Sequence, residues 1–403
     1  MPFTLNDFRQ EVKEELFKIL EYWIEHSIDK EKGGFYGTVN GKNIPDPNAP
    51  KGIVVTSRIL WTFSAVQQLF PDNRYVKMAD RAYDYIINHF VDKEYGGVYW
   101  SVTADGTPLE KKKQLYGHSF AIYSLSEYYK ISKKQEVLDA AKDIFSQVIR
   151  HGYDKAKGGY IEAFERDWSN TDDYILSRGE NRKSMNTHIH LLEAYTNLYK
   201  VWKSESSTFH LRHAIDLMLH HIVDPHTYRM TLFFKEDWTH TSETISYGHD
   251  IEASWLLWEA AEALGDSKIK MKCKDVSIQM AKAATDGLAA DGALNYEYEP
   301  STKHLNDSKQ WWPEAEAMVG FYNAYQLSHK VTYLGKSEKI WDFIKKHLID
   351  RVNGEWFGGV DANGKVISDD KINFWKGPYH SSRACMEMWR RLGRNSEDLQ
   401  LWR

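Results

Sequence analysis

Hydrophobic side chains recur every three or four residues in twelve stretches of this chain, which is the spacing of α-helices. Alternate stretches differ in how far the apolar residues extend around the helix. Stretches of the first kind carry charges on one face and are predicted near residues 4–26, 72–90, 133–150, 207–222, 266–285 and 334–348. Stretches of the second kind are apolar nearly all round and are predicted near 54–70, 114–131, 185–203, 246–264, 309–328 and 378–393.

A turn rich in glycine or aromatic residues follows each helix of the first kind. The turns begin at an aspartate and recur at intervals of about 60 to 70 residues, which suits a helix pair with a generous loop. They are Asp29 to Tyr36, Asp92 to Trp100, Asp154 to Tyr160, Asp224 to Phe233, Asp291 to Tyr296 and Asp350 to Gly359.

This repeat predicts an all-α fold, an (α/α)6 barrel of six antiparallel helix pairs in a single domain over residues 1–403. Helices that are apolar on every side belong in an inner ring, and the charged ones belong in an outer ring. The array is expected to close on itself, because an open array would leave two apolar end faces in water.

Closure gathers the N-terminal ends of all inner helices at one mouth of the barrel. Each repeat brings polar or aromatic residues to that level, and their convergence on one cavity is typical of a binding site. The residues are Arg58, Tyr116, Asn186, His188, His190, His249, Glu252, Trp311, Trp312, Glu314, Glu316, Tyr379, His380 and Arg383.

Charge and composition exclude several classes of protein. A formal net charge of -5 gives no case for nucleic acid or an anionic membrane, and no apolar stretch is long enough to span one. Two cysteines and no secretory signal favour a cytoplasmic enzyme. The charged outer helices fit a monomer without excluding a dimer. We expect the lysine run 111–113 to form a solvated turn.

Aromatic residues make up 14% of the chain, and several lie at the mouth rather than within a helix. Trp311, Trp312, Trp375 and Tyr116 are of this kind. A flat ring in a cleft suits the apolar face of a sugar, although core packing is the alternative for the Trp311–Trp312 pair.

Among 17 histidines, His190, His249 and His380 stand out because they lie together at the mouth. Glu252 lies one turn after His249, where its carboxylate is expected to hold the imidazole in one tautomer. The helix N-terminus disfavours the imidazolium, so His249 is expected to be a neutral base. Most other histidines, including His118 and His188, are expected to be solvated or hydrogen-bonded structural residues.

Three reaction classes fit this mouth. Glycoside hydrolysis needs two carboxylates, for which Glu252, Glu314 and Glu316 are candidates. A metal site would use His188, His190, His249 and Glu252, but His188 and His190 point about 200° apart on one helix, so we expect no metal. Enolisation of an aldose needs a base and an oxyanion donor, which His249 with Arg58 and His190 supply.

Four segments of the chain resemble the cellobiose 2-epimerases of the N-acylglucosamine 2-epimerase superfamily. They are residues 186–193, 246–255, 311–316 and 375–380, which read NTHIHLLE, SYGHDIEASW, WWPEAE and WKGPYH. The similarity covers essentially the whole chain, including residues 57–61 and 162–168. Glu314 and Phe374 differ from the residues that the family usually has at these positions, and this difference affects the polarity expected of the sugar subsites.

This resemblance implies an (α/α)6-barrel enzyme without cofactor that interconverts glucose and mannose at the reducing end of β-1,4-linked disaccharides. In such enzymes the ring opens, one histidine removes the carbon-2 proton to give a cis-enediolate, and one returns a proton to the opposite face. It implies His249, His380 and His190 as catalytic residues. Its implied substrate-binding residues are Arg58, Tyr116, Asn186, Glu252, Trp255, Trp311, Trp312, Glu316 and Trp375. The alternatives are an aldose–ketose isomerase or a glycosidase on the same barrel.

Overall fold

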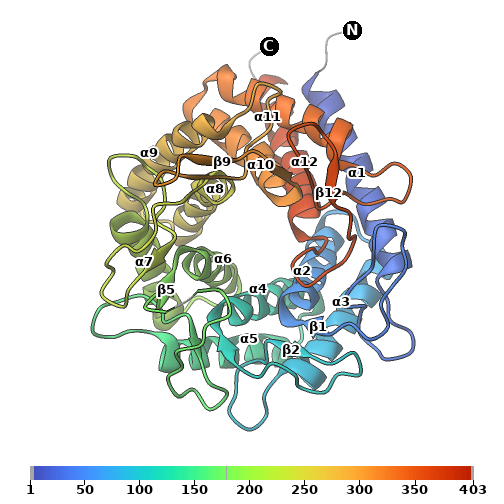
Figure 1. Cartoon of the computed structure of the whole chain (residues 1–403), viewed down its shortest axis with the longest axis vertical. Coiled ribbons are helices and arrows are strands. Elements are labelled where there is room, and N and C mark those ends of the chain that lie inside the picture. Colours follow the sequence, from blue (N-terminus) through green and yellow to red (C-terminus); the bar gives the residue numbers. More distant parts are fainter. Residues whose placement is uncertain (1–3, 178, 401–403) are drawn as a thin grey trace.

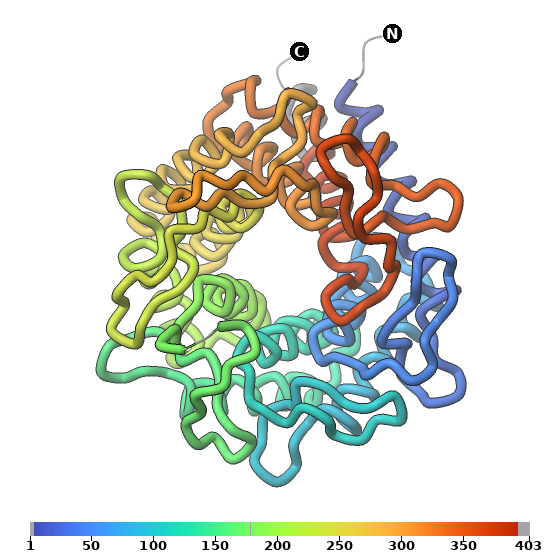
Figure 2. Tube along the Cα trace, viewed as in Figure 1, coloured from blue at the N-terminus to red at the C-terminus, as the bar shows by residue number. Residues whose placement is uncertain are grey.

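The computed structural model describes residues 4–177 and 179–400 of the predicted domain, so residues 1–3, 178 and 401–403 lie outside it. Its helices follow one another around a ring in sequence order (Figures 1 and 2). The first helix, α1 (Leu5–His26), lies beside the last, α12 (Tyr379–Gln400), and this contact closes the ring. The predicted barrel is therefore observed.

Two concentric sets of helices make up the described part of the chain. The inner helices are α2 (Ile53–Leu69), α4 (Leu115–Ser132), α6 (Met185–Val201), α8 (Tyr247–Leu264), α10 (Trp311–Ser328) and α12, and each packs against the next until α12 meets α2. The outer helices are α1, α3 (Asn73–Tyr85), α5 (Gln135–Gln147), α7 (Glu205–Leu217), α9 (Ser267–Ala284) and α11 (Val331–Phe343).

The outer helices end in a way that the sequence pattern did not predict. Four of them pass into one π-helical turn, at Ile86–Phe90, Val148–Gly152, Met218–Ile222 and Ile344–Leu348, whereas α9 ends in a 3-10 turn at Thr285–Gly287. A π-turn inserts one residue into the helical ladder without breaking the apolar pattern. The predicted helix over 72–90 is thus α3 followed by such a turn.

Short antiparallel strands fix where the inner helices begin. The pairs are β1 (Lys51–Gly52) with β2 (Ser101–Val102), β3 (Lys113–Gln114) with β4 (Ala163–Phe164), β5 (Lys183–Ser184) with β6 (Phe233–Phe234), β7 (Ile245–Ser246) with β8 (Glu297–Glu299), and β10 (Lys309–Gln310) with β11 (Gly359–Val360). β9 (His304–Asn306) and β12 (Val366–Ser368) extend two of these sheets. Each pair ties the strand before an inner helix to the loop of the next repeat, so neighbouring helix starts are held at one level.

Buried aspartate–lysine pairs brace the repeated turns. Asp92 Oδ1 accepts hydrogen bonds from the backbone N–H groups of Glu94 and Tyr95, and its Oδ2 lies 2.8 Å from Lys113 Nζ. Lys113 is fully buried, so the predicted solvated turn is wrong at this residue, although Lys111 is exposed. The same 2.8 Å pairing recurs at Lys51–Asp29, Lys183–Asp154 and Lys371–Asp350.

The fourth residue of four inner helices anchors the preceding turn. His118 Nδ1 donates to the carbonyl of Gln114, and its Nε2 accepts the backbone N–H of Val98. His188 is bonded in the same way, which confirms its predicted structural role and places it away from the mouth. Asp250 and Glu314 accept the N–H groups of Met230 and Leu294. Glu314 is therefore a structural residue, and the interpretation as a catalytic acid is wrong.

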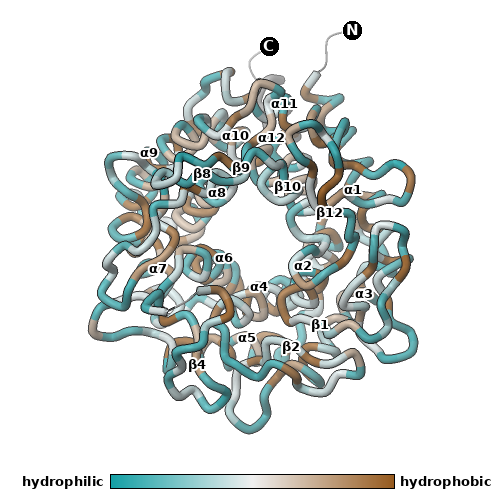
Figure 3. Tube along the Cα trace, viewed as in Figure 1, coloured by the Kyte–Doolittle hydropathy of each residue, from teal (hydrophilic) through white to brown (hydrophobic). Residues whose placement is uncertain are grey.

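Hydropathy follows this architecture. The loops at the outer margin of the ring are mostly hydrophilic (Figure 3). The inner helices are buried on nearly every side, as the predicted all-round apolar pattern requires. No helix in residues 4–177 or 179–400 is both long and apolar enough to cross a membrane.

Candidate active site

One cavity of about 370 Å³ opens at the N-terminal ends of the inner helices. This size falls within the range of small-molecule sites. Every residue predicted to be catalytic or substrate-binding lines it except Trp255 and Glu316, and the lining also includes three residues that were not predicted. Four further residues predicted at the mouth do not line it: His188, Glu314, Tyr379 and Arg383. The lining residues are Arg58, Tyr116, Leu176, Asn186, His190, His249, Glu252, Tyr296, Gln310, Trp311, Trp312, Trp375 and His380.

His249 begins the first turn of α8 and presents its ring to the cavity. Its Nδ1 lies 2.8 Å from the hydroxyl of Ser246, the residue before the helix. A hydroxyl can accept from Nδ1–H, and that tautomer leaves the basic lone pair on Nε2. Burial, followed by the charge of His190, lowers the pKa of His249 to about 3, so the ring is neutral near pH 7.

The predicted hydrogen bond between Glu252 and His249 does not form. Glu252 Oε1 instead accepts a hydrogen bond of 2.8 Å from Arg383 Nη2, and Ser246 is the partner of His249. A spacing of three residues places two side chains on one helix face, but here an arginine from another helix competes for the carboxylate. The neutral state of His249 is as expected, although burial is its main cause.

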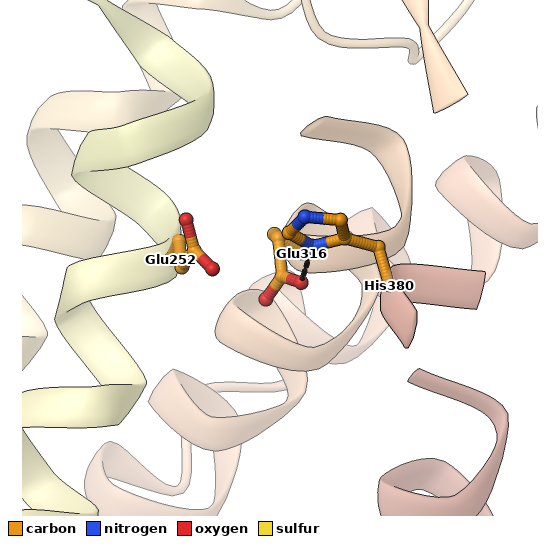
Figure 4. A group of neighbouring side chains, drawn as sticks. All are labelled: Glu252, Glu316 and His380. Atoms are coloured by element: carbon orange, nitrogen blue, oxygen red, sulfur yellow. Dashed lines mark hydrogen bonds and ion pairs between the residues drawn. The ribbon is translucent and has the colours of Figure 1, made fainter. Parts of the chain in front are cut away.

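His380 lies in the first turn of α12, and a carboxylate fixes its orientation. Its Nδ1 donates to Glu316 Oε1 of α10 across 2.6 Å, which leaves Nε2 as the unprotonated nitrogen (Figure 4). Burial and the charges of Arg58 and Arg383 hold the pKa of His380 well below its usual value. Glu316 therefore serves the histidine from below the cavity and does not line it, contrary to its predicted role in substrate binding.

The rings of both histidines lie close to the same indole. The ring centroid of Trp312 is 4.6 Å from that of His249 and 5.8 Å from that of His380. Two neutral imidazoles beside one indole ring are suited to proton transfer at a single bound molecule.

His190 is a third neutral-capable histidine at this mouth. Its Nδ1 lies 3.1 Å from Glu193 Oε2 of the same helix, and burial lowers its pKa despite that carboxylate. Arg58 Nη2 donates to the hydroxyl of Tyr116 across 3.2 Å, and its guanidinium lies over the ring of Phe120. These residues line one wall of the cavity, and Arg58 and His190 are the groups predicted to hold sugar oxygens.

Aromatic rings line much of the cavity. Trp375 is 39% exposed, and its ring centroid is 6.0 Å from that of Tyr116. Tyr296, which the sequence analysis missed, packs edge-on against Trp312 at 6.2 Å. Trp311 and Trp312 both line the cavity, and both are partly exposed.

Trp255 is not a wall of this cavity. It lies two helical turns farther along α8 and is 2% exposed. Its Nε1 donates to Glu316 Oε2 across 3.0 Å, and the guanidinium of Arg383 lies 4.7 Å from its ring centroid. Trp255 therefore supports Glu316 from below, and its role in substrate binding stays a prediction that the lining of this cavity does not favour.

Arg383 occupies the floor between the cavity and a second hollow at the other end of the inner ring. It contacts three buried carboxyl groups, those of Glu193, Glu252 and Glu316. The second hollow, of about 330 Å³, is lined by Arg383, Glu193 and Trp255 among others. Arg383 was predicted to lie at the mouth, but it lies beneath the cavity and has a structural role there.

The residues best placed to hold a metal ion are Glu252, Glu316 and His380, whose ligand atoms lie within 4.8 Å of one another. Arg383 Nη2 donates to both carboxylates and supplies the positive charge that an ion would bring. The arrangement therefore does not favour a metal. The ligand set that was considered and disfavoured from the sequence does not assemble, because both ring nitrogens of His188 bond the backbone elsewhere.

Residues that the sequence analysis missed had only weak signals. Leu176 lies in a long loop without a helical pattern, and Gln310 lies in a two-residue strand at the start of a stretch that was predicted to be helical. Ser246 had a usable signal, since it precedes His249 by three residues at the start of a predicted helix.

Comparison with known proteins places this site in a family. Residues 33–384 match the sequence model of N-acylglucosamine 2-epimerase. The chain is 44% identical to a cellobiose 2-epimerase of Bacteroides fragilis, over 94% of this chain and 98% of that one. It is 37% identical to a cellobiose 2-epimerase of Dictyoglomus turgidum, over 94% and 99%. The solved structure of cellobiose 2-epimerase from Bacillus thermoamylovorans is 36% identical and superposes with a TM-score of 0.91, covering 96% of this chain and 100% of that one.

Proposed function

This chain belongs to the N-acylglucosamine 2-epimerase family, and from that premise we propose that it is a cellobiose 2-epimerase. It interconverts glucose and mannose at the reducing end of a β-1,4-linked disaccharide. The observation that carries the proposal is the pair His249 and His380, two imidazoles beside Trp312 in one cavity.

The reaction proceeds by proton transfer at carbon 2 of the opened sugar. Neutral His249 removes the proton through Nε2, and the electron pair moves into a cis-enediolate. His380 takes up a proton at Nε2 from solvent and delivers it to the opposite face of carbon 2, while Glu316 on its Nδ1 stabilises the imidazolium form. His249 then releases the proton that it removed to solvent. In the reverse direction the two histidines exchange roles. His380 also assists ring opening.

Donors around the mouth stabilise the negative charge of the enediolate. Arg58, Asn186 and His190 line the same cavity and hold the oxygens at carbons 1 to 3. Trp312, Trp375 and Tyr116 pack against the apolar faces of the sugar rings. The chemistry needs neither cofactor nor metal, because the proton is the only group transferred.

The cavity has too few carboxyl groups for glycoside hydrolysis. Glycosidases need two of them beside the scissile bond. Among the described residues that line the cavity, Glu252 is the only one with a carboxyl group. Glu314 bonds Leu294 outside the cavity, and both oxygens of Glu316 accept hydrogen bonds.

Product analysis tests the proposal. Incubation with cellobiose should give glucosyl-mannose, whereas free glucose would indicate hydrolysis and a glucosyl-fructose product would indicate aldose–ketose isomerisation. A parallel run with mannobiose ranks the two disaccharides. His249→Asn and His380→Asn should each lower kcat by about 10³-fold. His226→Asn, on an exposed turn, is the control and should leave it unchanged. Retained activity in both site variants would contradict the assignment.

A further inference from the structure

Three carboxyl groups share one guanidinium directly beneath the cavity. Arg383 Nη1 donates to Glu193 Oε1, and Nη2 donates to Glu252 Oε1 at 2.8 Å and to Glu316 Oε1 at 2.6 Å. Each of the four side chains is no more than 4% exposed. If all three carboxyl groups were ionised, their charges would exceed that of Arg383, and buried like charges of this kind retain a proton instead.

Two of the three carboxyl groups have no room for that proton. Glu316 Oε1 accepts from His380 Nδ1 and Arg383 Nη2, and its Oε2 accepts from Trp255 Nε1 at 3.0 Å. Glu193 Oε1 accepts from Arg383 and from the hydroxyl of Tyr379, and its Oε2 faces Nδ1 of His190 at 3.1 Å. A carboxyl group whose two oxygens both face donors is best satisfied as an acceptor only, which is the ionised form.

Glu252 differs from both. Its Oε1 accepts from Arg383, and no hydrogen-bond partner within the described residues is found for its Oε2. One of its oxygens lies within 4.8 Å of a carboxylate oxygen of Glu316, and the two side chains approach each other (Figure 4). Glu252 also lines the cavity. It is the member of the network with a free oxygen at the cavity.

We propose that Glu252 is held as a neutral carboxylic acid and that its O–H group donates a hydrogen bond to an oxygen of the opened sugar that becomes negatively charged in the enediolate. The role in the reaction rests on the proposed function, whereas the protonation state follows from the network alone. Arg383 is the positioning residue that keeps Glu193 and Glu316 ionised beside His190 and His380.

Electrostatics agrees with this assignment. Burial and then the charge of Glu316 raise the pKa of Glu252 well above its usual value. The pKa of Glu193 lies below its usual value, because Arg383 and His190 outweigh the effect of burial. A neutral acid in a cavity is a strong donor to a developing oxyanion and adds no repelling charge.

Infrared spectroscopy tests the protonation state without any turnover. The spectrum of the wild-type protein minus that of Glu252→Gln at pH 7 should contain the C=O band of a protonated carboxyl group, shifted in D₂O. Cellobiitol, the unreactive alcohol of cellobiose, should shift this band when it binds. Glu314→Gln is the matched control, because it removes a buried carboxyl group outside the cavity, and the band that it removes should not respond to cellobiitol.

Kinetics of Glu252→Gln test the role in the reaction. The amide keeps a neutral donor but a weaker one, so kcat should fall about 10- to 100-fold while KM stays within about threefold. A carboxylate band in place of the protonated one would overturn the assigned state, and an unchanged kcat would overturn the assigned role. A wild-type protein without epimerase activity would refute the proposed function, yet the spectrum of the free protein would still decide the protonation state.

Discussion

Glu316→Gln isolates the contribution of the carboxylate that orients His380. The wild-type carboxylate accepts from His380, Arg383 and Trp255, whereas a glutamine offers one acceptor oxygen and must turn its NH₂ group toward a donor. A hydrogen bond to a charged group contributes about 1.5–3 kcal/mol, and that contribution is greatest when His380 carries a proton. Because about 1.4 kcal/mol corresponds to a factor of ten, kcat should fall about 10- to 100-fold.

The fold should tolerate this substitution. Arg383 keeps Glu193 and Glu252 as hydrogen-bond partners, so the guanidinium is not left unpaired in the variant. We therefore expect KM within about threefold of the wild-type value and a Tm lowered by less than about 5 °C.

The assay compares initial rates of epimerisation at several cellobiose concentrations with thermal unfolding followed by circular dichroism. Glu314→Gln is the matched control, since Glu314 lies on the same helix two residues earlier, is equally buried and contacts no histidine of the site. A kcat of Glu316→Gln within about threefold of wild type would refute the reasoning. So would an equal loss in Glu314→Gln.

Three further predictions concern pH, packing and the turns. Because the pKa of His249 is lowered to about 3, kcat/KM should show no acid limb near pH 6.5, and a limb there would contradict the neutral state. The pKa values of His118 and His188 are also lowered to about 3, so the unfolded chain binds protons below about pH 6.5 that the folded protein does not. The free energy of unfolding, measured by urea titration, should therefore fall by about 1.4 kcal/mol per pH unit for each histidine as the pH decreases from about 6.5. Lys113→Met leaves Asp92 with Arg166 as its remaining cationic partner, which should cost about 1.5–3 kcal/mol in urea unfolding but leave kcat unchanged, and a cost under about 1 kcal/mol would contradict the structural role of this pair.

The helical framework was predictable because its signal is local. Apolar spacing placed every inner helix start within two residues of the observed one, as for the predicted 54–70 and the observed α2, Ile53–Leu69, but α12 runs to Gln400, seven residues beyond the predicted end at 393. The π-helical turns were not predictable, since one inserted residue hardly disturbs an apolar pattern.

Contacts between distant parts of the chain account for the errors in the site. Glu252 was assigned to His249 on helix spacing, but Arg383 is 131 residues away in sequence and no local pattern reveals it. Lys113 looked like part of a solvated run because its partner, Asp92, belongs to another segment. Helix geometry alone could have predicted that Trp255 lies deep in the barrel, because eight residues beyond Tyr247 correspond to about 12 Å along the helix axis.

Isotope exchange tests the central claim, proton transfer at carbon 2 between two histidines, most directly. The protein is incubated with cellobiose in D₂O, and both disaccharides are then examined by NMR at carbon 2 of the reducing sugar. Deuterium is expected at that position in glucosyl-mannose and, at equilibrium, in cellobiose. Formation of glucosyl-mannose with protium retained at carbon 2 throughout would contradict it.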